Sequence, residues 1–396
     1  MTATFGFVDP GQQAWMLLDD GRTAAYARAI ERTVRAGDVV LDIGSGSGVL
    51  ALLAARAGAR RVYAVERTGM IELVRAHAKE NGFADVIVPV RKDFLDEEVD
   101  ALFATPEDRP RVIVGEVMGA LAVDEGQQHL YARARALSRD DAVCIPRATR
   151  LLMAPARPRK LDEELARVRA VHGVTLDALV DRLRARVSTF ALTPDDMVGD
   201  ERALDALPTH APLPRAFHTT LVVHRAGPVT GIVCAFEAEL ADDVVLSTSV
   251  RAPPTHWGQT FFPVHPPLDV PAGATIDVVI RPRVVTDRGT WAWTVTHQGE
   301  ARRGDAMRSL VGDLDDTAAQ LGLRIDDDGD SYVASRALSA WANALGAPLA
   351  NEGAIDVAAL AARVHAADPA GYPDESAARQ EVRALLRAAG ATKAKR

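Results

Sequence analysis

Residues 38–66, with the sequence DVVLDIGSGSGVLALLAARAGARRVYAVE, leave few folds open to this chain. They begin with an apolar run at residues 39–41, which is too short for a free-standing helix and typical of a buried parallel strand. An Ala- and Leu-rich stretch at residues 49–57 then predicts a helix, and residues 61–65 predict a second strand. Strand, helix and strand in this order predict a βαβ unit.

The turn between the first strand and the helix contains three glycines at alternate positions, and the second strand ends at Glu66. Glycine lets the backbone approach a ligand closely, and a carboxylate at the tip of the next strand suits a ribose diol. A dinucleotide fingerprint requires G-x-G-x-x-G, whereas the pattern here is G-x-G-x-G, and no Gly-Lys-Ser/Thr follows as in a P-loop. The glycines are Gly44, Gly46 and Gly48.

Asp42 precedes these glycines, and the pattern D-x-G-x-G-x-G with a later strand-end acid resembles the S-adenosylmethionine site of Rossmann-like methyltransferases. The resemblance implies S-adenosylmethionine as the cofactor and S-adenosylhomocysteine as its product. Asp42, the three glycines and Glu66 would then bind the cofactor. The alternative is a tight strand-to-helix turn that binds no ligand.

Composition excludes several other classes of protein. The chain has 396 residues, enough for two or three domains, and 46 basic against 54 acidic residues give it a net charge of −8. No basic patch marks a general nucleic-acid binder. The two cysteines, Cys144 and Cys234, lie far apart in apolar sequence, so we expect core thiols in a reducing compartment and no metal site.

No targeting or membrane segment is evident in the sequence. The first residues, MTATFGFVDPGQQ, lack the cationic and apolar regions of a signal peptide. No window approaches eighteen apolar residues, so we expect no membrane contact and a cytoplasmic location.

Upstream of the glycine motif, residues 12–35 predict one amphipathic helix with Trp15 on its apolar stripe. Asp19 and Arg22 form part of a polar cluster within it. A guanidinium matches a carboxylate in a two-pronged geometry, so Arg22 is a candidate to bind the methionine carboxylate of the cofactor. The alternative is a solvated helix residue.

A third strand is expected at residues 86–90, followed by Asp93 and Phe94. An acid and an aromatic ring at this strand end are where Rossmann-like methyltransferases usually contact adenine. Asp93 as an ordinary helix cap is the alternative.

The pattern changes near residue 155. Residues 158–206 are charged with helical spacing, and residues 219–296 contain at least five short strands separated by turn signals, which predicts a barrel or sandwich. Residues 305–396 return to helical spacing. We therefore expect domains at 1–150, 151–304 and 305–396.

Five stretches in matching order make residues 12–300 resemble the catalytic core of protein arginine methyltransferases. They are the M-L-x-D-x-x-R-T-x-x-Y run at Met16–Tyr26, the glycine motif, the loop carrying Glu116, Met118 and Glu125, the joint at Ile145–Thr149, and Thr255-His256-Trp257. The resemblance implies an α/β fold: a Rossmann-like class I methyltransferase domain, then a β-barrel domain with an inserted helical dimerisation arm at about 158–206. It also implies a homodimer.

The resemblance assigns roles to individual residues. Glu116 and Glu125 would bind the acceptor guanidinium, and His256 with Asp19 would form a proton relay. The cofactor would be bound by Met16, Arg22, Asp42, Gly44, Gly46, Gly48, Glu66, Asp93, Phe94 and Glu116. The acceptor would contact Glu116, Met118, Glu125 and Trp257. Alternatives are solvated loop glutamates and a histidine satisfied at an interface.

Paired glutamates suit an arginine acceptor chemically. A guanidinium has a pKa above about 12, so its nitrogens are poor nucleophiles until they are polarised. Two carboxylates can hold its fork, localise charge on one nitrogen and fix the attack geometry, where orientation alone contributes about 7–11 kcal/mol. A carboxylate or histidine then takes the proton as the methyl moves.

Three departures weaken the prediction of an arginine acceptor. Val117 and Ala120 replace the tryptophan and tyrosine of the family's E-W-M-G-Y loop, and an N-terminal aromatic helix is mostly lacking, with Phe7 as its one trace. Cation–π contacts to the guanidinium are thereby lost. The alternatives are another peptide group or a small molecule as acceptor, as in peptide natural-product tailoring, or an inactive scaffold.

Residues 305–396 lie outside that core. Their pattern faintly resembles winged-helix modules that bind leader peptides, which would let this module hold a peptide substrate. A plain helical cap on the barrel is the alternative.

Overall fold

The computed structural model describes residues 10–123, 125–284 and 289–305, and four strand segments at 324–327, 330–333, 349–350 and 354–356. The chain divides into two compact units. Unit 1 comprises Met1–Leu152, Ala203–Leu213 and Ala235–Gln259, and unit 2 comprises Met153–Arg202, Pro214–Cys234 and Thr260–Arg396.

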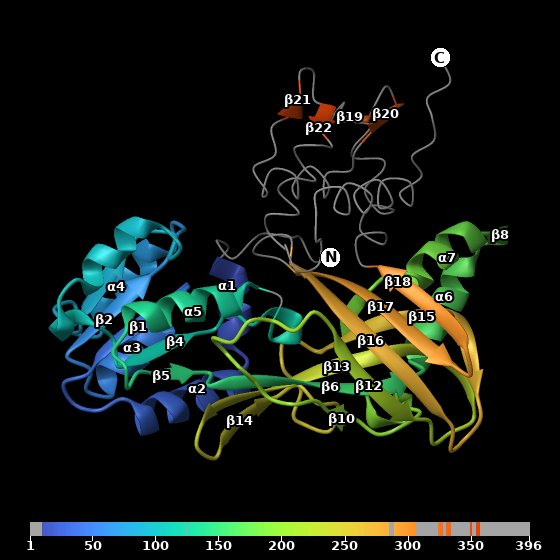
Figure 1. Cartoon of the computed structure of the whole chain (residues 1–396), viewed down its shortest axis with the longest axis horizontal. Coiled ribbons are helices and arrows are strands. Elements are labelled where there is room, and N and C mark those ends of the chain that lie inside the picture. The colour runs from blue at the N-terminus through green and yellow to red at the C-terminus, as the bar shows by residue number, and fades with distance from the viewer. Residues whose placement is uncertain are drawn as a thin grey trace. The chain divides into compact units, whose positions relative to one another are not determined.

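Unit 1 is built on a five-stranded parallel sheet with the order β3-β2-β1-β4-β5 (Figure 1). Every residue of β1 and β4 is buried, as expected of parallel strands covered on both faces. The chain reverses its direction of winding between β1 and β4, where open α/β sheets bind ligands. The strands are β1 (Val39–Ile43), β2 (Arg61–Val65), β3 (Ile87–Val90), β4 (Val112–Gly115) and β5 (Val143–Ile145).

Helices flank this sheet (Figure 1). They are α2 (Asp20–Thr33), α3 (Val49–Arg56), α4 (Ile71–Glu80) and α5 (Gln127–Leu137), while α1 (Pro10–Leu17) packs against α2. Three 3₁₀ turns complete this part of the chain: η1 (Glu97–Phe103), η2 (Pro106–Asp108) and η3 (Gly119–Leu121). The prediction of one helix over residues 12–35 is wrong. The helix breaks at Asp19, whose Oδ1 accepts a hydrogen bond from the Arg22 backbone N–H at 3.0 Å and so caps α2.

The core of unit 1 is apolar, and both cysteines are buried free thiols as predicted. Burial raises the pKa of the Cys144 thiol to about 11, so it is unreactive at neutral pH. A buried ion pair lies at the amino ends of β1 and β4, where Arg111 Nε binds Asp38 Oδ1 at 2.6 Å.

The barrel strands form two sheets. The first has the order β10-β6-β13-β15-β9, with β11 on β6 and β14 on β13, and the second has the order β12-β16-β17-β18. Strands β6 and β13 contribute residues to both units. The bounds are β6 (Ala148–Ala156), β9 (Ser188–Phe190), β10 (Arg202–Ala203), β11 (Leu207–Pro208), β12 (Phe217–Val222), β13 (Gly227–Ala241), β14 (Val244–Ser247), β15 (Gln259–Val270), β16 (Thr275–Val284), β17 (Gly289–His297) and β18 (Glu300–Asp305).

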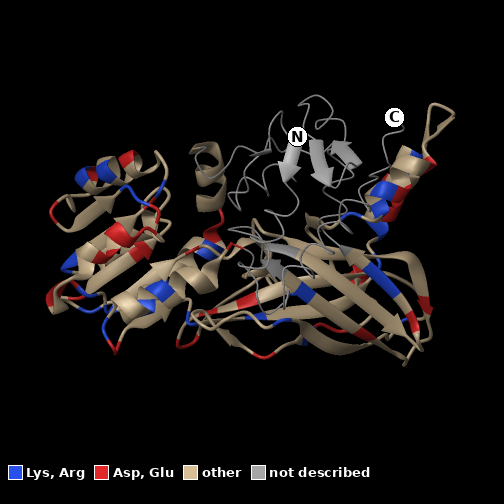
Figure 2. Cartoon of the chain, turned by 45° about the horizontal axis from the view of Figure 1, so that its top comes forward, with Lys and Arg blue, Asp and Glu red and all other residues tan. Residues whose placement is uncertain are grey.

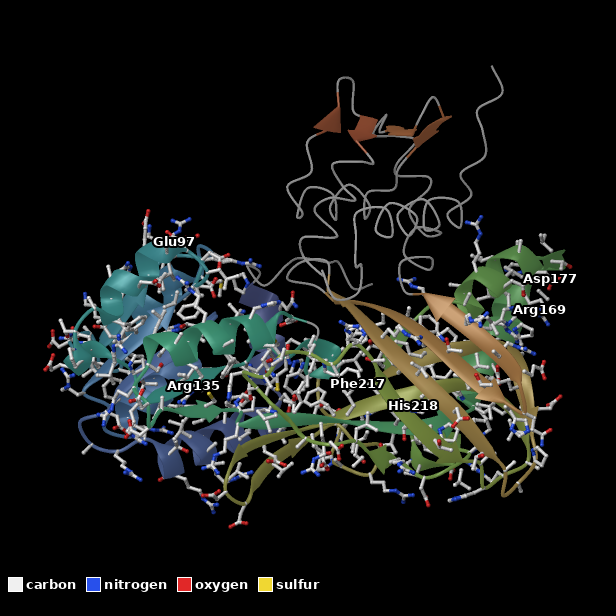
Figure 3. All side chains as sticks on the ribbon, viewed as in Figure 1. Glu97, Arg135, Arg169, Asp177, Phe217 and His218 are labelled. Carbon is white, nitrogen blue, oxygen red and sulfur yellow. The ribbon has the colours of Figure 1, made fainter. Side chains whose placement is uncertain are left out.

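An arm of unit 2 carries α6 (Arg159–Arg169), the short hairpin β7 (Ala170–Val171) and β8 (Val174–Thr175), and α7 (Asp177–Arg184). Arg169 Nε binds Asp177 Oδ1 at 2.9 Å across the hairpin (Figure 3). Figure 2 shows acidic and basic residues intermixed on these helices. The helical prediction for 158–206 extends too far, because α7 ends at Arg184 and β9, the 3₁₀ turn η4 (Pro194–Asp196) and β10 follow.

Four further strands form a sheet with the order β20-β19-β22-β21. They are β19 (Arg324–Asp327), β20 (Asp330–Val333), β21 (Leu349–Ala350) and β22 (Ala354–Asp356). The predicted helices of residues 305–396 lie outside the described residues. No helix within the described ranges is long and apolar enough to span a membrane.

Candidate active site

A glycine loop lies at the carboxyl end of β1. Gly44, Gly46 and Gly48 all have positive φ, with values of 69°, 52° and 85°. A Cβ on Gly46 would lie 2.8 Å from Gln13 Oε1, so a side chain there would displace Gln13 and would also strain the backbone at positive φ. The three positive φ values favour glycine throughout this loop, which we call the glycine cradle.

Glu66, at the end of β2, holds this loop in place. Its Oε2 accepts a hydrogen bond from the Gly46 N–H at 3.0 Å, and its Oε1 accepts one from the Thr68 N–H at 2.8 Å. The carboxylate therefore lies against the glycine loop, and its binding of a ribose stays a prediction.

Asp42, in β1, is 0% exposed, and neither carboxylate oxygen has a hydrogen-bond partner within the described residues. Burial raises the pKa of Asp42 to about 7. Ser45 and the Ala51 N–H lie close enough to lower this pKa in part, but neither forms a well-aligned hydrogen bond, so this buried carboxyl beside the glycine cradle is incompletely satisfied. These residues fit S-adenosylmethionine.

Arg22 and Glu116 bind one another. Arg22 Nε and Nη2 both donate to Glu116 Oε2, at 3.2 and 2.6 Å, and the two side chains are 7% and 9% exposed. Burial would lower the pKa of Arg22, but the charge of Glu116 raises it above its ordinary value. Among the residues that the structure describes, Glu116 Oε1 has only a long contact of 3.5 Å with the Met118 N–H, so one oxygen remains for a second cation.

His256 and Asp19 form a second buried pair, 237 residues apart in the sequence. Asp19 Oδ2 accepts hydrogen bonds from the His256 backbone N–H and from Nδ1, each at 2.9 Å. Burial would raise the pKa of Asp19, but hydrogen bonds from the backbone N–H groups of Arg22 and His256 lower it.

The protonation state of His256 follows from its surroundings. Burial lowers the pKa of His256 and outweighs its hydrogen bond to Asp19, so the ring is neutral at pH 7. Because Asp19 is ionised, Nδ1 carries the hydrogen and Nε2 is the proton acceptor. The pair is thus arranged as a base with an orienting carboxylate.

The predicted adenine contacts are occupied by protein groups. Asp93 Oδ1 accepts from the Leu95 N–H at 3.0 Å, and Oδ2 lies 3.5 Å from Arg67 Nη1. Phe94 is buried in the core, with Arg133 over its ring at 6.0 Å. Their roles toward adenine stay predictions.

The remaining predicted residues differ in exposure. Met118 is fully buried, and Met16 and Trp257 are nearly so, while Glu125 is half-buried two residues before α5. The Trp257 ring lies 3.9 Å from His256, between centroids. Direct contact of Met118 with an acceptor would require the loop to move.

Two residues at the site escaped the sequence analysis. Gln13 Oε1 accepts from the Ser47 N–H at 3.2 Å and lies on the glycine loop, although nothing in its pattern signals this. Trp15, predicted on the apolar stripe, is 53% exposed and meets the His256 ring edge-on at 5.2 Å. Its position next to the family motif was the available signal.

The comparisons with known proteins define the class. Residues 21–105 match the family model "Ribosomal protein L11 methyltransferase (PrmA)", and residues 186–289 match "Arginine methyltransferase oligomerization subdomain". The solved Trypanosoma brucei PRMT1 enzyme–prozyme complex has a TM-score of 0.66 at 22% identity, over 76% of this chain and 98% of that chain. Arabidopsis thaliana protein arginine methyltransferase 10 has a TM-score of 0.61 at 22% identity, over 76% and 99%. The fold is that of a Rossmann-like methyltransferase joined to a barrel, as predicted.

Sequence relatives give the family. An arginine N(omega)-methyltransferase of Streptomyces achromogenes subsp. streptozoticus is 31% identical over 279 residues, which are 66% of this chain and 73% of that protein. Protein arginine N-methyltransferase PRMT10 of Oryza sativa subsp. japonica is 29% identical over 311 residues, or 67% and 79%. The chain belongs to the arginine methyltransferase family, and the predicted enzyme class, an S-adenosylmethionine-dependent methyltransferase, is confirmed.

Proposed function

We propose that this chain transfers a methyl group from S-adenosylmethionine to a guanidino nitrogen of arginine in a protein or peptide. One observation supports arginine as the acceptor. Glu116 already binds the guanidinium of Arg22 through Oε2, and its Oε1 is left for a second guanidinium. This carboxylate directly follows β4, the strand next to the glycine loop of β1.

The residues of unit 1 suit the cofactor. The glycine cradle would let the cofactor approach the backbone closely, and Glu66 would accept hydrogen bonds from the ribose hydroxyls. Arg22 would bind the cofactor's carboxylate through Nη1, the nitrogen that does not bind Glu116. When bound, the cofactor supplies a methyl group activated by a positively charged sulfur.

The chain's own groups prepare the acceptor. Glu116 and Glu125 would bind the guanidinium from two sides, orient one nitrogen and concentrate positive charge on the others. The methylated nitrogen becomes acidic, and its proton passes to a carboxylate or to Nε2 of His256, with Asp19 holding the imidazole.

Arginine as a free amino acid is the second candidate acceptor. The Streptomyces relative is named for arginine itself, without the word protein.

Release of S-adenosylhomocysteine tests these assignments. We expect release with arginine-containing peptides, and none with the same peptides carrying lysine in place of arginine. Release with free arginine alone would select the second candidate. Release that is equal for arginine and lysine peptides would contradict both.

Replacement of Glu66 tests the cofactor site. Glu66→Ala removes the acceptor for ribose hydroxyls and the carboxylate that holds the Gly46 N–H, so S-adenosylmethionine binding should weaken by at least about 1.5–3 kcal/mol. Calorimetry measures this, with the exposed Glu72→Gln as a matched control. Unchanged affinity would remove Glu66 from the site.

We further propose that the arm formed by α6, β7, β8 and α7 makes a homodimer. It exposes three apolar side chains, Val171, Val174 and Leu179, and a closed two-fold pair is the commonest assembly that would cover them. The match to an oligomerization subdomain, which begins just after this arm, supports assembly.

Light scattering tests whether the arm makes a dimer. The chain should have twice its mass of 42.4 kDa at micromolar concentration, and a Val174→Asp, Leu179→Asp double variant should be monomeric. Val245→Asp changes an equally exposed valine on β14 and should remain dimeric. A monomeric parent chain would refute the proposal.

Three further assignments stay proposals. They are the division into domains at 1–150, 151–304 and 305–396, the binding of a peptide by residues 305–396, and a cytoplasmic location. Labelled peptide capture by the full chain, compared with residues 1–304 if that piece folds, would test the second.

A further inference from the structure

A polar cavity lies at the end of the parallel sheet opposite the glycine loop. It has a volume of about 210 Å³ and is lined by residues of unit 1 only. Arg111 directly precedes β4 and Val143 begins β5, so the cavity lies at the amino ends of the strands. Gly44, Glu66 and Glu116 follow the carboxyl ends. The cavity is therefore separate from the candidate active site.

Positive charge dominates this cavity. Its lining includes four arginines and one acid, which are Arg32, Arg35, Arg111, Arg147 and Asp242. Asp38 lies behind Arg111 and binds it, and Asp141, whose charge also acts on Arg111, is paired with Arg139 outside the cavity. Four guanidinium groups against two carboxylates leave two positive charges uncompensated among these residues.

Hydrogen bonds hold the Arg111 side chain in one position at the cavity wall. Its side chain is 9% exposed, and Nε and Nη2 bind Asp38 and the Thr33 carbonyl oxygen. Within the described residues, Nη1 has no hydrogen-bond partner, and Arg111 lines the cavity. A buried guanidinium held by its other two nitrogens loses little conformational entropy when Nη1 binds a ligand.

Asp242 holds two of the other arginines. Its side chain forms an ion pair with Arg147 Nη1, and its backbone carbonyl oxygen accepts from Arg32 Nη1 at 2.8 Å. Asp242 is largely exposed, on the turn between β13 and β14. The Asp242 carboxylate therefore competes with an incoming anion for the guanidinium of Arg147.

We propose that this cavity is a binding site for a compact, multiply charged oxyanion, namely a phosphoryl group of a small molecule. Planar guanidinium groups bind phosphoryl oxygens through paired, charge-assisted hydrogen bonds. An excess of two positive charges matches a doubly negative group. The cavity volume suits a phosphate or pyrophosphate and excludes a folded partner. The site does not depend on the methyl-transfer chemistry.

Calorimetry with inorganic pyrophosphate and with inorganic phosphate tests the site. The full chain is used at fixed ionic strength, with and without saturating S-adenosylhomocysteine, so that anion binding in the active site is recognised. One bound pyrophosphate per chain is expected under both conditions. Binding that disappears with S-adenosylhomocysteine would place the anion in the active site and overturn the proposal.

Substitutions at the cavity should change the affinity for pyrophosphate in opposite directions. Arg35→Gln and Arg147→Gln should each weaken pyrophosphate binding about tenfold or more, the usual effect of a lost hydrogen bond to a charged group. Asp242→Asn should tighten binding several-fold, because it removes the competing carboxylate. Arg28→Gln changes an exposed arginine outside the cavity and should bind as the parent chain does. Equal affinity in all four variants, or no binding above an equivalent chloride control, would refute the site.

Discussion

Glu116→Gln and Glu125→Gln are each expected to lose methyl transfer by about 10²–10⁴-fold, the general range for positioned acid–base groups, while still binding S-adenosylmethionine. A guanidinium bound by both carboxylates is misoriented when either becomes an amide. For Glu116 the structure adds a reason: Oε2 is occupied by Arg22, so the acceptor depends on Oε1. Turnover and cofactor affinity are measured in parallel.

The two variants also separate the acceptor classes. A neutral hydroxyl, thiol or amine needs only one carboxylate as base, so one glutamine variant would then keep near-normal turnover. That result would end the assignment of arginine as acceptor. Glu72→Gln, an exposed glutamate of α4, is the matched control and should retain full activity. An amide at 116 keeps an oxygen that accepts from Arg22, so the fold should persist.

Asp42→Asn should become progressively more stable than the parent chain as the pH rises from 4 to 8, by about 4 kcal/mol in total without cofactor. Burial raises the pKa of Asp42 from 3.8 to about 7, so the folded chain holds a proton that the unfolded chain has released. Between these pKa values, stability therefore falls as the pH rises. The asparagine variant does not titrate and avoids this loss.

Urea unfolding at several pH values, followed by hydrogen exchange of the β1 amides, measures this difference. Asp38→Asn is the control of opposite sign. Burial alone would raise the pKa of Asp38, but Arg111 lowers it, so its stabilisation is lost only as the pH falls through that lowered pKa. The loss of unfolding free energy in Asp38→Asn should therefore be constant from pH 5 to 8. A difference for Asp42→Asn that is independent of pH would show that Asp42 is ionised in the folded chain.

Local patterns predicted the elements that are specified locally. The apolar run before Gly44 is β1, and the acid that ends the next strand, Glu66, binds the Gly46 N–H. Such features follow from strand length and glycine spacing, which are visible within about thirty residues. The helix break at Asp19 was also readable, because an aspartate three residues before Arg22 is a typical N-cap.

Long-range contacts could not be predicted from spacing. Asp19 and His256 were paired only through the family resemblance, since no local rule joins residues 237 positions apart. The binding of Glu116 by Arg22 was not predicted, although both residues had been assigned to the site. Gln13 and the arginine-lined cavity depend on tertiary packing alone.

Location of the transferred methyl group tests the central claim most directly. The full chain is incubated with S-adenosylmethionine carrying an isotope-labelled methyl group and with arginine-containing peptides or free arginine, and fragmentation mass spectrometry assigns the labelled atom. The label should lie on a guanidino nitrogen and should be absent with Glu116→Gln. A label on any other acceptor atom, with arginine unmodified, would contradict the account.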